Sequence, residues 1–256
     1  EETALHQTLK EHIYLDNIDN EQQIMKQNIK IKAKRDIYYA DCESYVSNPN
    51  NLNLNHSVEH KLQLLGVSNS ENDFVNILNV CDKVFTATEE VSSEQLVVYE
   101  FLKNITKNGT KDALGYFHNL KYDYHLLEQY INIKDKCEKD NQIYSVNIKY
   151  KGKLVELRDS FKLIPFALSK FQKEFGLPEE FGKKEAISYE YYTKENNDVR
   201  IKTDDYRKLL SFDDQKIFDI QMKNEPSFKC GTFNPMDYYK EYLRLDCLVL
   251  KKGVEK

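Results

Sequence analysis

The stretch IYYADCESYV, residues 37–46, sets two carboxylates into an apolar run. Its aromatic and β-branched residues predict a strand. Because side chains alternate faces along a strand, Asp41 and Glu43 emerge on one face, opposite to Cys42. Two neighbouring carboxylates repel each other unless a cation lies between them, which favours a metal site. The alternative is that the acids end the strand and face water, since short acidic motifs recur by chance.

The sequence beyond this stretch predicts a succession of strands and helices. Apolar residues recur with the period of a strand or of a helix, and turn or cap residues mark most ends. In chain order, we expect strands over 60–67 and 74–80, a helix over 93–107, a strand over 113–119, a helix over 120–131, a hairpin of 143–150 and 153–160 around Lys151-Gly152, a helix over 166–175 opened by Pro165, and a helix over 236–252 capped by Asn234. An initial meander followed by helices that alternate with further strands predicts an α/β fold with a central mixed sheet.

Length and local composition predict one principal domain with two additions. A chain of 256 residues is long enough for one sizeable core. Residues 1–35 are polar and weakly helical and precede the first strand, so we expect an N-terminal extension there. The remainder, 36–256, forms the domain. Residues 190–230 are rich in Lys, Asp and Asn without a clear period, which predicts an inserted subregion.

Composition and charge exclude several classes of protein. The five cysteines are widely spaced and form no C-x-x-C pair, so we expect reduced thiols rather than zinc ligands or disulfides. The amino terminus has no basic and apolar signal segment, and no run of about eighteen apolar residues occurs. We therefore expect a soluble intracellular chain without a membrane partner. The net charge of −5 leaves nucleic acid open as a partner, because bound divalent cations offset an acidic site.

Two further segments place carboxylates among apolar residues. In FHNLKYDYHLL, Asp123 lies in the first turn of a helix, with Asn119 at the strand-to-helix junction and Tyr122 beside it. An acid there also complements the helix dipole, which is the alternative for Asp123 alone. In YYKEYLRLDCLVL, Tyr242 and Asp246 share one helix face, and a carboxylate among leucines is costly to bury without a partner. The alternative for Asp246 is a place at the edge of the helix.

The three acidic segments together resemble a known set of motifs. Asp-x-Glu on a strand, Asn-x-x-Tyr-Asp at a helix start and Tyr-x-x-x-Asp in a late helix resemble the exonuclease motifs of the DEDD nuclease superfamily. The tyrosine form is that of the proofreading domains of family B DNA polymerases, which have a ribonuclease H-like fold. HNLKYD, RDSFKLIPFALSKFQKEFGL and GKKEAISY resemble blocks of the protein-primed members found in phages, linear plasmids and virus-like mobile elements. The resemblance covers about residues 36 to 252.

The resemblance implies a role for each of these residues. The implied ligands of two Mg²⁺ or Mn²⁺ ions are Asp41, Glu43, Asp123 and Asp246. Tyr242 would orient the attacking water, and Lys184 would assist at the scissile phosphate. The implied contacts to the single-stranded DNA 3′ end are His118, Asn119, Tyr122, Ser160, Phe161 and Tyr189. This chain departs from the family where Phe161 replaces a leucine and where Lys183 adjoins Lys184, which leaves two registers for the lysine.

The motifs therefore predict an enzyme, the 3′–5′ exonuclease part of a DNA-directed DNA polymerase, which removes mismatched ends by two-metal hydrolysis. Nothing in the chain resembles the palm-domain aspartates that polymerisation requires. We expect a palm domain downstream in a longer polymerase, with a terminal protein as primer. Two alternatives remain: a free-standing exoribonuclease of the DEDD type, and a catalytically silent module that binds single strands or the terminal protein.

Overall fold

The computed structural model describes residues 35–47, 59–84, 86–182, 186–193, 196, 199–224 and 231–256. The chain divides into two units, Glu1–Arg35 and Asp36–Lys256. All described residues except Arg35 belong to the second unit.

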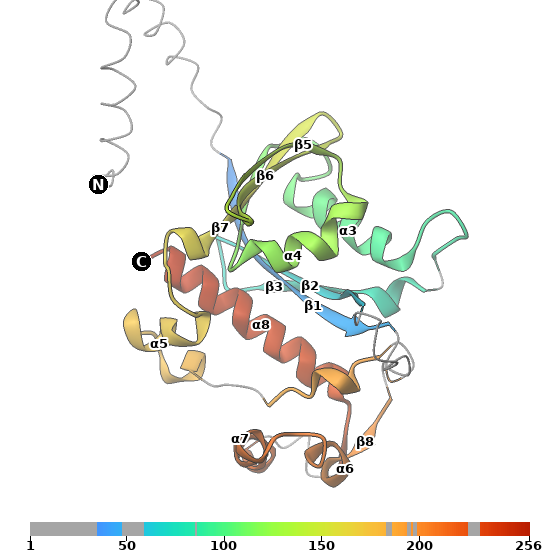
Figure 1. The fold of residues 1–256 in the computed structure, drawn as a ribbon, viewed down its shortest axis with the longest axis vertical. Coiled ribbons are helices and arrows are strands. Elements are labelled where there is room, and N and C mark those ends of the chain that lie inside the picture. Colours follow the sequence, from blue (N-terminus) through green and yellow to red (C-terminus); the bar gives the residue numbers. More distant parts are fainter. Residues whose placement is uncertain are drawn as a thin grey trace, which may run out of the picture. The chain divides into compact units, whose positions relative to one another are not determined.

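A seven-stranded sheet forms the centre of the second unit (Figure 1). Across the sheet the strands are β3 (Val75–Asn79), β2 (His60–Asn69), β1 (Asp36–Val46), β4 (Ala113–Phe117), β7 (Lys153–Asp159), β6 (Gln142–Tyr150) and β5 (Ile133–Lys139). The pairs β1–β4 and β4–β7 are parallel, whereas the other neighbours are antiparallel. This mixed sheet, begun by an antiparallel meander and flanked by helices, confirms the predicted α/β class with a central mixed sheet.

Helices cover both faces of the sheet (Figure 1). The α-helices are α3 (Ser93–Ile105), α4 (Leu120–Leu127), α5 (Phe171–Glu174), α6 (Thr203–Arg207), α7 (Phe212–Asn224) and α8 (Pro235–Val254). Short 3₁₀ turns lie at Val80–Lys83, Glu128–Tyr130, Ser160–Lys162, Leu168–Lys170, Glu179–Gly182 and Tyr189–Tyr191. A second, two-stranded sheet pairs β8 (Ile201–Lys202) with β9 (Thr232–Phe233). None of the helices that the structure describes has the length and apolar character needed to cross a lipid bilayer.

Two large clusters of buried hydrophobic residues pack against the sheet. Ala40 and Cys42 pack with α3 and α4 in one cluster of buried residues. Leu64 of β2 packs with α8 and the β8–β9 region in another. Most of β1 is buried, as expected for a strand with a neighbour on each side and helices on both faces. Glu43 is thus buried and Asp41 half-buried within a covered strand, rather than both facing water at the end of a surface strand.

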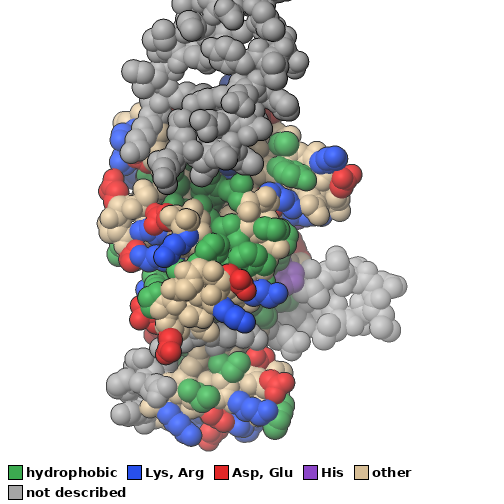
Figure 2. Space-filling model, turned by 90° about the vertical axis from the view of Figure 1, so that its left-hand side faces the viewer, with side chains coloured by type: hydrophobic (Ala, Val, Ile, Leu, Met, Phe, Trp, Pro, Cys, Tyr) green, Lys and Arg blue, Asp and Glu red, His purple; other side chains and the backbone are tan. Residues whose placement is uncertain are grey.

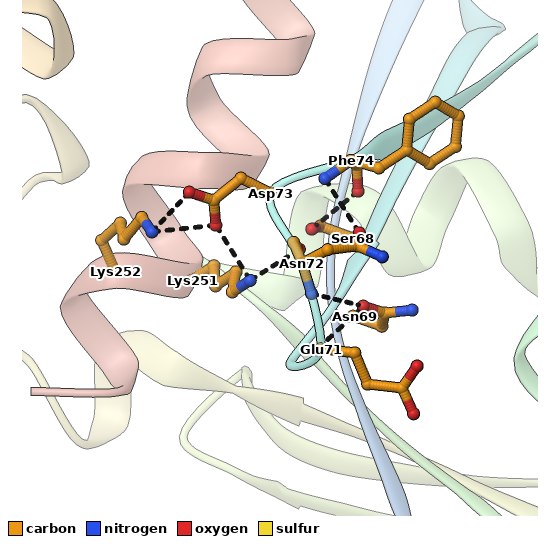
Figure 3. A network of polar contacts seen from close by, with 8 residues as sticks. All are labelled: Ser68, Asn69, Glu71, Asn72, Asp73, Phe74, Lys251 and Lys252. Carbon is orange, nitrogen blue, oxygen red and sulfur yellow. Dashed lines mark hydrogen bonds and ion pairs between the residues drawn. The ribbon is translucent and has the colours of Figure 1, made fainter.

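Helix α8 crosses the sheet and is held at both ends. At its start the Asn234 side chain accepts a hydrogen bond from Met236 N at 2.9 Å. Near its end, Figure 3 shows Lys251 and Lys252 converging on Asp73 in the turn between β2 and β3. Lys251 Nζ lies 3.0 Å from Asp73 Oδ1 and is almost fully buried, while Lys252 Nζ lies 2.6 Å from Asp73 Oδ2. These contacts fix the end of α8 to the β2–β3 turn, beside the strand β1 that carries the acidic pair.

Most predicted elements are confirmed, one predicted helix was wrong, and strand β5 was missed. The predicted helix over 166–175 is a 3₁₀ turn followed by the single turn α5. Phe166 instead packs its ring against that of Phe171, with centroids 5.4 Å apart, and its carbonyl oxygen lies 3.0 Å from His118 Nε2. Strand β5 was not predicted, because every one of its residues is exposed and shows no apolar alternation. It exists because its backbone pairs with β6 at the edge of the sheet.

Surface charges of opposite sign pair with each other at several places. Arg207 Nε lies 2.7 Å from Asp219, and Arg244 Nη2 lies 2.7 Å from Glu241. On the face shown in Figure 2, Lys and Arg side chains are interspersed with Asp and Glu around a central apolar area. Such exposed pairs contribute roughly 0–1 kcal/mol each, so the fold depends mainly on the buried clusters.

Candidate active site

Three carboxylates from distant parts of the sequence meet beside the sheet. Asp41 and Glu43 lie on β1, and Asp246 lies on α8. Each offers one carboxylate oxygen, and these oxygens all lie within 4.8 Å of one another. Glu43 is only 7% exposed, and its strand continues to Val46. The alternative in which the acids end a strand and face water is therefore wrong for Glu43.

Asp123 lies next to these carboxylates but binds the backbone. It sits in the first turn of α4 and is 2% exposed. Its Oδ1 accepts a hydrogen bond from Cys42 N at 3.0 Å, between the two acids of β1. The contact joins α4 to β1, so Asp123 does more than complement the dipole of its helix. Its predicted role as a fourth metal ligand stays a prediction.

Burial and mutual repulsion act together on the four acids. Burial raises the pKa of Asp246 to about 8, with a further contribution from the charge of Asp41. Burial likewise raises the pKa of Asp123 to about 8. Burial raises the pKa of Asp41 and of Glu43 well above the usual value, and nearby carboxylates add to the increase. Ionised carboxylates in such a place are stabilised by a cation, and an all-oxygen ligand set suits Mg²⁺ or Mn²⁺.

A cleft of about 440 Å³ opens over the carboxylates. Its lining comes from β1, β2, the start of α4 with the residues before it, two 3₁₀ turns and α8. The lining residues are Asp41, Cys42, Glu43, Ser44, His60, His118, Tyr122, Leu168, Tyr189, Tyr242 and Asp246. A second hollow of about 460 Å³ adjoins it, shares Leu168, Tyr189, Tyr242 and Asp246, and extends to Phe181 and Asp214. The acids thus lie in a groove long enough for more than a single small ion.

Tyr242 lies one helical turn before Asp246 and lines both hollows. Burial, followed by the charges of Asp246 and Glu43, raises the pKa of Tyr242. Its hydroxyl therefore stays protonated at neutral pH and is able both to donate and to accept a hydrogen bond. The structure brings Tyr242 to the carboxylates, as the sequence predicts, while its role toward a water stays a prediction.

Two of the residues that are predicted to contact single-stranded DNA, His118 and Ser160, are hydrogen-bonded to each other. His118 Nδ1 lies 2.9 Å from Ser160 Oγ, and His118 Nε2 lies 3.0 Å from Phe166 O. The ring of Phe161 packs edge-on against that of His118, with centroids 5.4 Å apart. Burial lowers the pKa of His118, which favours the neutral imidazole. In this structure His118 therefore supports the wall of the groove.

Asp159 is a residue that sequence reasoning missed. It is 4% exposed, and its Oδ1 accepts hydrogen bonds from Asn119 N at 2.8 Å and from Phe161 N at 3.0 Å. Asn119 has a left-handed backbone, with φ of 67°, and its side chain does not cap α4. Non-glycine residues in this conformation are uncommon and concentrate at functional sites. The sequence contains no signal for this role, because the carboxyl ends of the parallel strands β4 and β7 become neighbours only in the folded sheet.

Two of the residues that are predicted to contact DNA, Tyr122 and Tyr189, expose their aromatic rings at the cleft. Tyr122 is 45% exposed, and Tyr189 is 54% exposed. The Tyr122 hydroxyl lies 2.7 Å from Ser44 Oγ, which also lies 3.0 Å from His60 Nδ1. Ser44 and His60 line the cleft and were not predicted. Exposed rings beside a charged groove are suited to stacking on bases.

A second missed residue, Tyr239, contacts the acidic pair directly. Its hydroxyl donates to Glu43 Oε2 at 2.8 Å. It lies one turn before Tyr242 on the same face of α8, which is the signal that the spacing in YYKEY contained. Lys184 and Lys183 lie outside the residues that the structure describes, so the role of Lys184 and its register stay predictions.

Comparisons with known proteins identify a family for most of the chain. Residues 106–256 match the family described as DNA polymerase type B, organellar and viral. Among solved structures, the chain is similar to Phi29 DNA polymerase in complexes with primer-template DNA and with single-stranded DNA, at 17% identity and TM-scores of 0.43 and 0.40. It is also similar to the family B DNA polymerase of the hyperthermophilic archaeon Pyrobaculum calidifontis, at 11% identity and a TM-score of 0.41. These matches cover 86% of this chain but only 31% of the Phi29 chains and 24% of the archaeal one. No curated protein sequence matches the chain.

Proposed function

Since the chain belongs to the organellar and viral DNA polymerases of type B, we propose that residues 36–256 are the 3′–5′ exonuclease domain of such an enzyme. The domain removes mismatched nucleotides from a single-stranded DNA 3′ end. The observation that carries the proposal is the meeting of Asp41, Glu43 and Asp246, whose oxygens lie within 4.8 Å of one another. The palm domain and the terminal-protein primer of the whole polymerase belong to the same proposal.

The carboxylates fit a pair of Mg²⁺ or Mn²⁺ ions. Asp41, Glu43 and Asp246 would hold them, with Asp123 as a fourth ligand once its side chain turns from Cys42 N. When bound, two divalent ions supply a hydroxide near neutral pH and stabilise the departing 3′ oxygen. The fit follows from burial and repulsion, which raise the pKa of each acid and leave the ionised cluster unstable on its own.

The groups around the acids of this chain have separate tasks. The protonated Tyr242 hydroxyl orients the attacking water through a hydrogen bond. Tyr122 and Tyr189 stack on the bases of the frayed end, at about 1–3 kcal/mol per base. A paired end must first melt before it reaches this groove, so mismatched ends are removed faster.

The test measures release of nucleotides from a 5′-labelled single-stranded DNA oligonucleotide in Mn²⁺. The parent chain shortens it from the 3′ end, and Asp246→Asn lowers the rate by at least about a hundredfold. Glu241→Gln is the matched control on the same helix, because Glu241 is exposed and pairs with Arg244. Both variants bind the oligonucleotide in EDTA as the parent does, since the strand contacts lie elsewhere.

Three results would speak against the proposal. Faster trimming of an RNA oligonucleotide of the same sequence favours the exoribonuclease. Binding without cleavage in Mg²⁺ or Mn²⁺ favours the silent module. Equal cleavage by the parent and by Asp246→Asn removes the carboxylates from the mechanism.

A further inference from the structure

We propose that Tyr239 is a positioning residue that orients Glu43 for metal binding, an inference that rests on the proposed function. It concerns a residue outside the three motifs. Tyr239 is not itself among the residues that line the cleft, but its hydroxyl bonds to the lining residue Glu43.

The hydroxyl of Tyr239 is placed between two acceptors of β1. It lies 2.8 Å from Glu43 Oε2 and 3.1 Å from Ser44 O. A hydroxyl has a single proton, and the charged carboxylate is the stronger acceptor, so the proton is directed at Glu43. One carboxylate oxygen of Glu43 is thereby held by Tyr239.

The ring of Tyr239 is itself fixed. Tyr239 is fully buried, and Tyr192 stacks on it with centroids 4.0 Å apart and planes 27° apart. The Tyr192 hydroxyl donates to Pro235 O at 3.0 Å, at the first position of α8. Tyr242 lies nearly parallel on the same helix face, with its centroid 6.4 Å from that of Tyr239. The packing around the ring therefore fixes the direction in which the hydroxyl of Tyr239 points.

The hydrogen bond from Tyr239 links helix α8 to Glu43 on β1. The helix carries Asp246, one of the three clustered carboxylates, and through Tyr239 it also orients a second one, Glu43. Without the hydroxyl, Glu43 Oε2 would lose its charge-assisted bond in a buried place, and the side chain would be free to turn. Partners of metal ligands of this kind typically change metal affinity or activity by about 10–100-fold when removed.

The test compares Tyr239→Phe with Tyr192→Phe. Both remove one buried hydroxyl from a stacked pair of rings, but only Tyr239 bonds to a carboxylate of the cleft. Mn²⁺ binding is measured by calorimetry without DNA. We expect Tyr239→Phe to weaken it by about 10–100-fold and Tyr192→Phe to leave it within about threefold of the parent.

Cleavage and strand binding provide the second readout. For Tyr239→Phe, raising the Mn²⁺ concentration restores most of the cleavage rate, and the affinity for single-stranded DNA in EDTA stays that of the parent. In a Glu43→Ala background the further change Tyr239→Phe has no added effect on Mn²⁺ binding, because the group that it orients is gone.

The outcomes separate this inference from the proposed function. If Asp41→Asn abolishes Mn²⁺ binding while Tyr239→Phe binds as the parent does, the positioning role is overturned and the proposed function stands. An equal loss in Tyr192→Phe, or an added loss in the Glu43→Ala background, assigns Tyr239 to packing and also overturns the role. A parent that binds no Mn²⁺ overturns both.

Discussion

Asp41 of β1 lies opposite Gly66 of β2, and the space left at Gly66 is filled by helix α8. A Cβ atom at position 66 would lie 2.8 Å from Cys247 Sγ and 2.9 Å from Leu243 Cγ. Cys247 directly follows Asp246, so the missing side chain on β2 lets α8 bring its carboxylate to the acid on β1. The close approach of backbone and helix is thus a condition for the site.

Gly66→Ala is expected to push α8 away from β2. Overpacking of this kind costs about 1–3 kcal/mol of unfolding free energy, and the shift separates Asp246 from Asp41. Urea unfolding measures the first effect, and Mn²⁺ calorimetry measures the second. Adding Cys247→Ala to Gly66→Ala removes the nearest clash, so it should return part of the Mn²⁺ affinity. Unchanged unfolding and Mn²⁺ binding in Gly66→Ala would show that the helix does not need this gap.

Asp159→Ala is expected to weaken DNA binding more than catalysis. The change leaves the backbone N–H groups of Asn119 and Phe161 without their shared acceptor. The backbone that follows β4 and β7 beside the groove is therefore held less firmly. KM for a single-stranded oligonucleotide should rise about tenfold, with kcat changed less. Asp159→Asn keeps an oxygen acceptor and should stay close to the parent. A fall in kcat alone, with KM unchanged, would contradict this assignment.

The metal-free protein is expected to lose stability as the pH rises. The pKa of Asp123 is raised by burial to about 8 in the folded chain, whereas it is near 3.8 in an unfolded one. Between these values the folded state keeps a proton that the unfolded state has released, so the stability present at about pH 4 declines as the pH approaches 8. Asp123→Asn removes the contribution of this residue, so the decline becomes shallower while Asp41, Glu43 and Asp246 keep theirs. Its side-chain oxygen still accepts from Cys42 N. Urea unfolding in EDTA from about pH 5 to pH 8.5 gives the comparison.

The control for that experiment is Asp82→Asn, which changes an exposed acid outside the cleft. It should retain the slope of the parent. Mn²⁺ at the alkaline end should raise the stability of the parent by mass action and that of Asp123→Asn by less. Parallel pH curves for the parent and Asp123→Asn would mean that this carboxylate does not hold an extra proton.

Lys184→Ala is expected to slow cleavage by about a hundredfold while single-stranded DNA still binds. A lysine that acts on the negative charge of the transition state contributes little to ground-state affinity. The expectation comes from the block GKKEAISY alone. Lys183→Ala is the matched control, and single-turnover rates at saturating DNA are the measurement. If Lys183→Ala is the slow variant, the register between the two lysines shifts by one.

Local pattern was enough for the elements that carry the acids. The alternation in residues 37–46 predicts a strand with Asp41 and Glu43 on one face, and both acids join one cluster. The cap at Asn234 and the helical period after it predict α8, on which Tyr242 and Asp246 share a face. These predictions succeeded because strand alternation and helix period depend only on neighbours in the chain.

Contacts between distant segments required the tertiary structure. The sequence does not say which strand meets which face of α8, so the bond from Tyr239 to Glu43 and the space at Gly66 were not foreseeable. Asp159 joins two strand ends that are adjacent only in the folded sheet. Strand β5 exists through backbone pairing that its exposed side chains do not signal. The sequence by itself therefore determined the acids, the tyrosine and the elements that bear them, whereas packing between those elements decided how the acids are held.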